Sequence, residues 1–318
     1  MKVSLDNALK NGYKRMVKIL FKPFNLVSWL IFGFASFLAS LGKGGGVNFN
    51  LRLQNLDGKQ AGNFAIIEDW LKMHIFGVFL VIVGIVVIAL ALFLLFTWLS
   101  SRGKFMFIYQ IANNKAEIQE PWSKYGHLAD RLFVFRLIFG FVIFFVFLAI
   151  VLFAILLLYP NIKAEQFGFS FFGKLFFSVF LLIVFVLLSV LINAVLLDFV
   201  VPLMFKKEVK VLQGFTIFYK ELFKENIGSF LLFYLLKIGL SIAASFVVLI
   251  GIFLTCCIAS LPYISSVVFL PISVFLESFT LSFLAEFGEE YNLFSWKIDV
   301  EKDNKINLVN DNKTQIEE

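Results

Sequence analysis

Six apolar stretches, each long enough to cross a lipid bilayer, dominate this sequence of 318 residues. A helix rises 1.5 Å per residue, so about 20 apolar residues cover a hydrocarbon core of about 30 Å. The chain is 60% hydrophobic, whereas a soluble globular domain is roughly 45–50% apolar. A soluble fold cannot hide this excess, because its surface must still face water. We therefore predict an all-α, polytopic membrane helix bundle of about six transmembrane helices, with interfacial amphipathic helices. The membrane domain is expected over residues 24–291, with spans at about 24–42, 74–101, 134–159, 173–205, 228–258 and 263–287.

The N-terminal segment, residues 1–23, is predicted to be an amphipathic helix that lies along the membrane surface. Apolar residues recur on one of its faces, while Lys10, Lys14 and Lys18 follow one another at four-residue spacing on another. Residues four apart are neighbours on a helix, so these lysines form one basic face. A basic amphipathic helix is typical of a segment that binds at the surface of anionic lipids. Pro23 then ends the helix before the first span.

The distribution of basic residues sets the expected orientation. Of 28 Lys and Arg residues, 21 lie in the N-terminal segment, in the loops expected at 102–136 and 206–226, or in the C-terminal tail. Basic residues collect on the cytoplasmic side of a membrane. We therefore expect a multi-pass protein of the cytoplasmic (inner) membrane with both termini in the cytoplasm. The polar tail, residues 292–318, is expected to be disordered. Because the basic residues flank apolar spans, no nucleic-acid partner is expected.

Residues that carry familiar catalytic chemistry are scarce. The two histidines, His74 and His127, fall at opposite ends of the expected topology and cannot meet across the membrane. Cys256 and Cys257 are neighbours, and adjacent cysteines form neither an ordinary disulfide nor, without further ligands, a zinc site. The sequence has no HExxH, GxxxxGK[ST] or GxSxG motif. We therefore expect no catalytic residue, no metal and no cofactor.

Three ionisable residues inside the expected spans are the main candidates for a functional site: Asp198, Lys237 and Glu277. Each lies about 10–15 Å from the cytoplasmic end of its span at 1.5 Å per residue, so all three share a similar depth. A charge inside the bilayer costs a few kcal/mol unless it is paired. We expect at least one carboxylate oxygen within about 4 Å of the Lys237 ammonium. Glu277 is the first candidate for this partner and Asp198 the second.

Two interpretations of this intramembrane polar cluster stay open at the level of sequence. It is either a packing clasp, in which Lys237 pairs with an acid or extends to the headgroups, or a polar site for a substrate or protons. Asn193 lies deeper in the fourth span and completes the candidate cluster. A hydrogen bond between helices is its default role.

Several short strings together resemble a prokaryotic group of multi-spanning membrane proteins. They are Ser101–Phe107, Pro121–Trp122, Asp198–Met204, the segment from Cys256 to Gly288, and the Gly-rich loop followed by Asn48–Asn50. The group is similar to the membrane domain found ahead of some glycerophosphodiester phosphodiesterases. The resemblance covers most of residues 20–291 and implies a membrane domain without an assigned activity. The His and carboxylate metal cluster of the soluble phosphodiesterase domain has no counterpart in this sequence, so that reaction is not implied.

These observations favour a non-enzymatic membrane protein that organises or senses the envelope. Membrane lipids, especially anionic lipids of the inner leaflet, are the expected partners, together with other membrane proteins or further copies of the chain. A transporter or permease with a polar site on the fourth to sixth spans is the alternative. A lipid-modifying enzyme fits the residue inventory least. The role of the Gly-rich loop 43–73 stays open.

Overall fold

The computed structural model describes residues 4–41, 75–164, 168–255 and 261–296, and all regular structure in these ranges is helical. The prediction of an all-α fold is thus confirmed for the described chain. The α-helices are α1 (Leu5–Phe21), α2 (Leu26–Ser40), α4 (Ile75–Asn113), α5 (Gln119–Lys124), α6 (Gly126–Lys163), α7 (Phe169–Val195), α8 (Val201–Lys207), α9 (Val211–Ile217), α10 (Ile227–Leu254), α11 (Pro262–Val268) and α12 (Leu270–Ala285). Two π-helical turns, η2 (Leu196–Val200) and η3 (Phe218–Phe223), and a 3-10 turn, η5 (Glu289–Tyr291), complete the described elements. The Gly-rich loop, both cysteines and the chain from residue 297 lie outside the described residues, so the expectations for them stay predictions.

Four helical segments are long and apolar enough to cross a membrane: α4, α6, α7 with its continuation through α8, and α10. The pair α11 and α12 is a fifth candidate if it counts as one span despite a bend of 66°. The helix in the first expected span, α2, has 15 residues. It is about 22 Å long and therefore shorter than a hydrocarbon core of about 30 Å. These long apolar helices indicate a multi-pass membrane protein with four or five candidate spans among the described residues, and the count of six stays a prediction.

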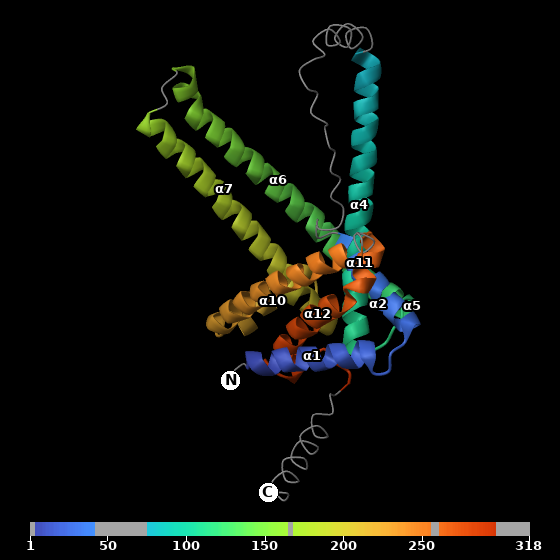
Figure 1. The fold of residues 1–318 in the computed structure, drawn as a ribbon. Helices are drawn as coiled ribbons and strands as arrows, with labels where there is room; N and C mark the ends of the chain where they lie inside the picture. The colour runs from blue at the N-terminus through green and yellow to red at the C-terminus, as the bar shows by residue number, and fades with distance from the viewer. Residues whose placement is uncertain (1–3, 42–74, 165–167, 256–260, 297–318) are drawn as a thin grey trace, which may run out of the picture.

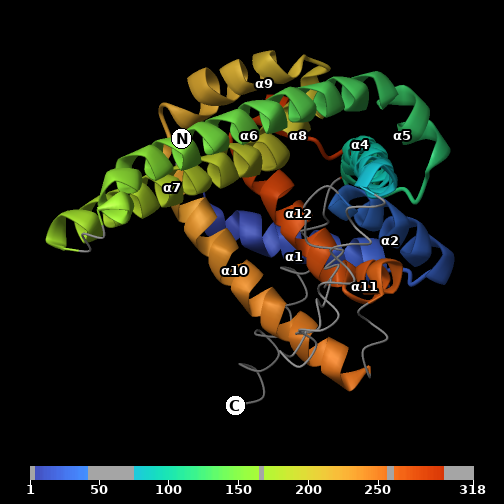
Figure 2. The same ribbon diagram turned by 90° about the horizontal axis from the view of Figure 1, so that it is seen from above.

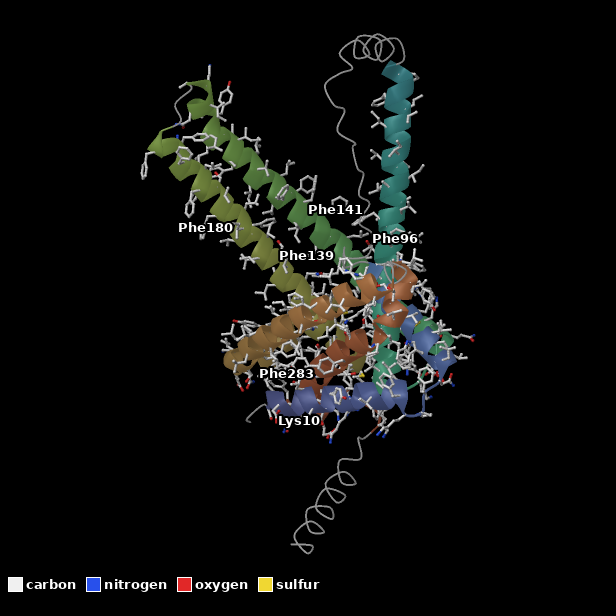
Figure 3. The ribbon with its side chains drawn as sticks, viewed as in Figure 1. Lys10, Phe96, Phe139, Phe141, Phe180 and Phe283 are labelled. Carbon is white, nitrogen blue, oxygen red and sulfur yellow. The ribbon has the colours of Figure 1, made fainter. Side chains whose placement is uncertain are left out.

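The molecule divides into projecting helices and a packed base (Figure 1). We call residues 75–96, 134–163 and 169–192 the arms, and the other described residues the base. Apolar side chains of the arms point outward (Figure 3), and Phe141 and Phe180 are 61% and 55% exposed. The α6 and α7 arms run side by side, while the α4 arm stands apart from them (Figures 1 and 2). The α4 arm is about 33 Å long at 1.5 Å per residue, which matches the thickness of a hydrocarbon core.

The second half of α4 forms the centre of the base, and this corrects the expectation of a cytoplasmic loop from residue 102. The helix continues to Asn113 because the stretch contains no proline and its apolar residues, such as Phe105 and Ile108, are buried. Gly103 is the position where α2 comes closest, since a Cβ there would collide with the Leu38 side chain. Only glycine permits so close an approach. Packing against α2 and α12 therefore stabilises a helix in a segment that its charges mark as a loop.

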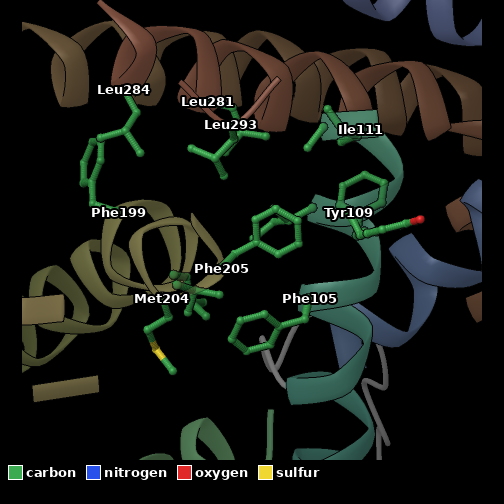
Figure 4. Packing of buried hydrophobic residues seen from close by; sticks show 14 of the residues in the cluster. Phe105, Tyr109, Ile111, Phe199, Met204, Phe205, Leu281, Leu284 and Leu293 are labelled. Atoms are coloured by element: carbon green, nitrogen blue, oxygen red, sulfur yellow. The ribbon is translucent and has the colours of Figure 1, made fainter. Parts of the chain in front are cut away.

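Aromatic side chains fill much of the core of the base. Phe199 of η2 is fully buried, and its ring centroid lies 5.3 Å from that of Phe218, 5.0 Å from that of Phe230 and 5.2 Å from that of Phe233. Figure 4 shows the neighbouring layer, where α8 faces α4 beside α12. Each ring buries a large apolar surface, so these contacts join η2, η3 and α10 into one core.

Helix α1 forms the underside of the base and packs against α12 (Figure 1). A Cβ on Gly12 would lie only 2.8 Å from the Cα atom of Phe279, so the two backbones meet at this glycine. The N-terminal amphipathic helix is therefore present at residues 5–21, and its apolar face covers the underside of the core.

Residues 292–296, which we call the strap, cross from α12 to α1 and α4. The Ser295 amide donates to the Ala112 carbonyl at 3.0 Å, and the Trp296 indole donates to the Ile111 carbonyl at 3.3 Å. These bonds satisfy carbonyls in the last turn of α4, which have no partner within the helix. The first five residues of the polar tail are therefore packed against the base.

Candidate functional site

The most deeply buried of the described ion pairs joins Lys104 of α4 to Glu277 of α12. Lys104 Nζ lies 2.7 Å from each carboxylate oxygen of Glu277, and the two side chains are only 3% and 9% exposed. Leaving either charge buried without the other costs several kcal/mol, so each residue requires its partner. We expected Glu277 to be the first partner of Lys237, and Lys104 to lie in a loop. The structure corrects both assignments.

A second ion pair joins Lys237 of α10 to Asp198 of η2. Lys237 Nζ lies 2.8 Å from Asp198 Oδ1, and the side chains are 18% and 15% exposed. Lys237 also donates a hydrogen bond of 3.0 Å to the Thr280 hydroxyl of α12. The structure thus places a carboxylate within the expected distance of Lys237. Asp198, the second candidate, provides it.

Helix α12 connects the two ion pairs. Thr280 follows Glu277 by three residues, so the two side chains are neighbours on the helix surface. The Thr280 hydroxyl donates to the Leu276 carbonyl at 2.9 Å while it accepts from Lys237. We call Lys104, Asp198, Lys237, Glu277 and Thr280 the paired-charge site. Its two ammonium groups face two carboxylates, so neither carboxylate of the site lacks a cation.

The π-helical turn η2 positions Asp198 within this site. The Val201 amide donates to the Leu196 carbonyl, a step of five residues instead of the usual four. Pro202 explains this widening, because proline has no amide N–H and its ring clashes with the carbonyl four residues earlier, which here belongs to Asp198. The regular α-helix accordingly ends at Val195, and α8 begins anew at Val201. Turns of this kind are frequent at functional sites in helices.

Three buried hydroxyl groups near the paired-charge site have no hydrogen-bond partner within the described chain. They belong to Tyr234, Ser278 and Ser282. Tyr234 precedes Lys237 by one turn of α10, and Ser278 directly follows Glu277 on α12. Buried hydroxyls without partners are uncommon in proteins, because each loses its hydrogen bonds to water. The two ion pairs are therefore well satisfied, while their surroundings keep unused hydrogen-bonding capacity.

Asn193, the remaining member of the expected cluster, lies apart from the paired-charge site. It is half-buried on α7, five residues before Asp198. No hydrogen bond found in the described part of the chain involves its side chain. The structure therefore brings together Asp198 and Lys237, gives Glu277 another partner, and does not join Asn193 to either pair.

A second charged cluster surrounds Arg102 where α4 enters the base. The guanidinium donates to both oxygens of Asp130 on α6, at 3.1 and 3.0 Å. It also lies over the rings of Trp98 and Trp122, with Cζ 4.7 and 5.2 Å from their centroids. Cation–π contacts and a bonded carboxylate together hold such a side chain in one position. Sequence reasoning missed this cluster, although Trp98 and Arg102, four residues apart on one helix, were a usable signal.

The three lysines of the basic face expected on α1 have different surroundings along the helix. Lys10, near the N-terminal end, forms an exposed ion pair of 2.6 Å with Asp6. Lys14 is half-buried, and Lys18 Nζ lies 5.2 Å from the centroid of the Trp296 ring in the strap. The N-terminal end of this face is therefore the more open to an external partner.

Arg15, which the sequence analysis did not single out, is the buried cation of α1. Its Cζ atom lies 3.4 Å from the ring centroid of Phe294 and 4.6 Å from that of Trp296. Its guanidinium also donates to the Trp296 carbonyl at 3.3 Å. Burial lowers the pKa of Arg15 to about 10. The strap thus covers a cation that would otherwise face solvent.

Two open grooves on the surface are lined by residues outside the paired-charge site. One has a volume of about 650 Å³ and is lined by polar residues of η3, η5 and the end of α8. The other has about 500 Å³ and an apolar lining from α1 and α10. Among the described residues, no group of three or more His, Cys, Asp or Glu side chains is arranged to hold a metal ion.

Comparison with known proteins adds one match. Residues 5–265 match the family described as "Family of unknown function (DUF7544)". No curated protein and no solved structure matches the chain. The matched residues include Lys104, Asp198 and Lys237. Glu277 and Thr280 of α12 lie beyond residue 265.

Proposed function

We propose a function for this chain, which belongs to DUF7544, a family of unknown function. It is a non-enzymatic, multi-pass protein of the cytoplasmic membrane. It organises or senses the envelope by binding lipids and membrane proteins. The pairing of buried charges carries this proposal. Each lysine of the paired-charge site has its own carboxylate, and neither surface groove is lined by these residues. Charges that serve transport face a water-filled passage, whereas charges neutralised in a packed core fasten helices to one another.

The proposed topology has six spans with both termini in the cytoplasm. The position of the basic residues supports it, because the base carries the lysines of α1, α8 and η3 while the arms carry few. The resemblance to the membrane domain ahead of some glycerophosphodiester phosphodiesterases fits the same proposal, since such a domain serves as a membrane unit without the hydrolytic residues.

Cysteine labelling tests this topology. In a variant whose native cysteines are replaced by alanine, Lys163→Cys at the end of α6 should react with an impermeant thiol reagent from outside the cell. Lys224→Cys, after η3, should react only once the membrane is opened. Labelling of both positions from the same side would overturn the orientation.

A paired substitution tests the structural role of the ion pairs. Lys104→Met with Glu277→Leu replaces the buried pair by apolar side chains, an exchange that is often neutral or stabilising. We expect this double variant to insert, to keep its thermal stability in detergent, and to retain the lipids that co-purify with the wild type. A double variant that folds normally but loses lipid or partner binding would contradict the proposal.

Transport is the second candidate, and the Asp198–Lys237 pair is the observation that favours it. This pair is more exposed than the Lys104–Glu277 pair. Its carboxylate belongs to the π-helical turn η2, and the Tyr234 hydroxyl has no hydrogen-bond partner among the described residues. Proteoliposomes with an entrapped pH-sensitive dye distinguish the two candidates. Proton flux in the wild type that disappears in Asp198→Asn, with the fold preserved, would favour a transporter. Equal, background-level flux in both favours the organising role.

A further inference from the structure

We propose that the apolar groove between α1 and α10 binds one acyl chain of an anionic glycerophospholipid, whose phosphate lies against the basic face at the start of α1. This inference rests on the proposed lipid-binding function and gives it a site and a ligand class. The groove has a volume of about 500 Å³, within the usual range for ligand sites of roughly 300–1,000 Å³.

The groove is lined by leucine and glycine residues of two helices that are far apart in sequence. Leu5 forms the α1 wall, and α10 contributes Leu232, Leu235, Leu236, Gly239 and Leu240. The α10 residues recur at intervals of three and four, so they form one continuous face of that helix. Leu235 is 67% exposed and Leu232 is 55% exposed, which leaves them available to a bound chain.

Gly239 makes room in the groove at the middle of the α10 face. A Cβ atom at this position would meet nothing within 4 Å, so the backbone of Gly239 is open to the groove. Gly12 and Gly214, by contrast, are each in contact with a neighbouring helix. The space beside Gly239 is therefore free for an external chain.

An acyl chain is the occupant that this environment supplies. Helix α10 is one of the candidate spans, and an apolar groove on such a helix faces hydrocarbon tails instead of water. Lipid tails are as apolar as leucine, so hydrophobicity alone gives no preference for the groove over the bilayer. Preference of the lipid for the groove must come from close packing of the acyl chain against its walls and from contacts made by the headgroup.

The start of α1 offers a charge that suits an anionic headgroup. Lys10 lies five residues beyond Leu5 and projects at the underside of the base (Figure 3), and Lys14 follows one turn later. Asp6 competes for Lys10 at 2.6 Å, but both side chains are about two-thirds exposed, and an exposed pair of this kind contributes little. A lipid phosphate can therefore replace Asp6 as the partner of Lys10. Tyr13, which is 58% exposed on the same helix, is a residue type that favours the headgroup region.

Photocrosslinking tests the site in the full chain reconstituted into phosphatidylcholine vesicles. The probes are phosphatidylglycerol and phosphatidylcholine that each carry a diazirine in one acyl chain, and crosslinked peptides are located by mass spectrometry. Gly239→Leu fills the groove. Gly84→Leu is the matched control, because Gly84 on the α4 arm also has nothing within 4 Å of its Cβ position but does not line the groove.

We expect phosphatidylglycerol to label the α10 face and the start of α1, with most of this labelling lost in Gly239→Leu and kept in Gly84→Leu. Lys10→Gln with Lys14→Gln should remove the preference for phosphatidylglycerol over phosphatidylcholine. Equal labelling of the wild type and Gly239→Leu, with both variants folded, would overturn the site. Equal labelling by both lipids would overturn the anionic headgroup. Neither result bears on the flux measurement that tests the proposed function, so the two failures are distinguishable.

Discussion

The arms and the base contain similarly apolar helices, but among the described glycines, those in close contact with other residues all lie in the base. In the arms, a Cβ added at Gly77, Gly84, Gly140 or Gly173 would meet nothing within 4 Å. In the base, a Cβ at Gly12, Gly33, Gly103 or Gly214 would collide with a neighbouring helix. One helix, α4, contains both kinds, since Gly84 is open and Gly103 is in contact with α2. Hydropathy therefore does not reveal which half of a long helix faces lipid and which half packs against protein.

Buried charge follows the same division. The two ion pairs of the paired-charge site lie in the base. The α6 and α7 arms are linked near their far end by Lys174, which donates to Asn161 at 2.6 Å. The base is therefore the region where charge substitutions should affect folding most.

Loss of the Glu277 carboxylate is expected to have the largest effect. Glu277→Leu leaves the Lys104 ammonium buried without a partner, and breaking a buried pair in this way costs about 3–5 kcal/mol. The free energy of unfolding in mixed detergent micelles, followed by circular dichroism, measures the loss. Adding Lys104→Met should restore most of it. A single variant as stable as the wild type would mean that Lys104 reaches water or another acid.

Filling a glycine contact in the base should have the next largest effect. Gly103→Val forces α2 away from α4, because its side chain would occupy the space of Leu38, and overpacking of this kind costs about 1–3 kcal/mol. Gly140→Val on the α6 arm is the control and should leave the free energy of unfolding nearly unchanged. Equal destabilisation by both substitutions would remove the distinction between base and arms.

A smaller effect is expected at the Arg102 cluster. Arg102→Lys keeps the positive charge but loses the planar guanidinium that lies over Trp98 and Trp122 and bonds both oxygens of Asp130. The loss should be about 1 kcal/mol, in the range of one cation–π contact. Thermal unfolding in detergent provides the measurement, and Arg131→Lys, an exposed position on α6, is the control. A shift of the same size in the control would exclude a specific role for the cluster.

The smallest predicted effect is a pH dependence at Glu221 in the polar groove. A hydrogen bond from Tyr291, together with Lys207, lowers the pKa of Glu221 below its ordinary value of 4.5. The stability from these contacts is complete above pH 4.5 and is lost as the pH falls through the folded-state pKa. Glu221→Gln should therefore reduce the loss of unfolding free energy at acid pH. If this loss is unchanged in the variant, other carboxylates cause it. The effect is small because the Glu221 side chain is 46% exposed.

The sequence was sufficient to predict the helical class, the long apolar helices and the amphipathic α1, because these follow from periodicity and length. It also identified Asp198, Lys237 and Glu277 as charges that need partners. It did not identify Lys104, because a lysine that follows Arg102 at the end of an apolar stretch looks like a cytoplasmic loop residue under the positive-inside rule. Burial of Lys104 depends on α12, which lies more than 150 residues later in the chain, and no local pattern carries that information.

The strap has a consequence for the order in which the protein can be assembled. Helix α1 is synthesised before the rest of the base, yet Arg15 is covered by Phe294 and Trp296, and Gly12 meets Phe279. Until those residues have been translated, α1 has neither its apolar partner nor the cover for its buried cation. The first helix therefore cannot complete its contacts while the middle of the chain is being made. It reaches its final place only after residues 279–296 have left the ribosome.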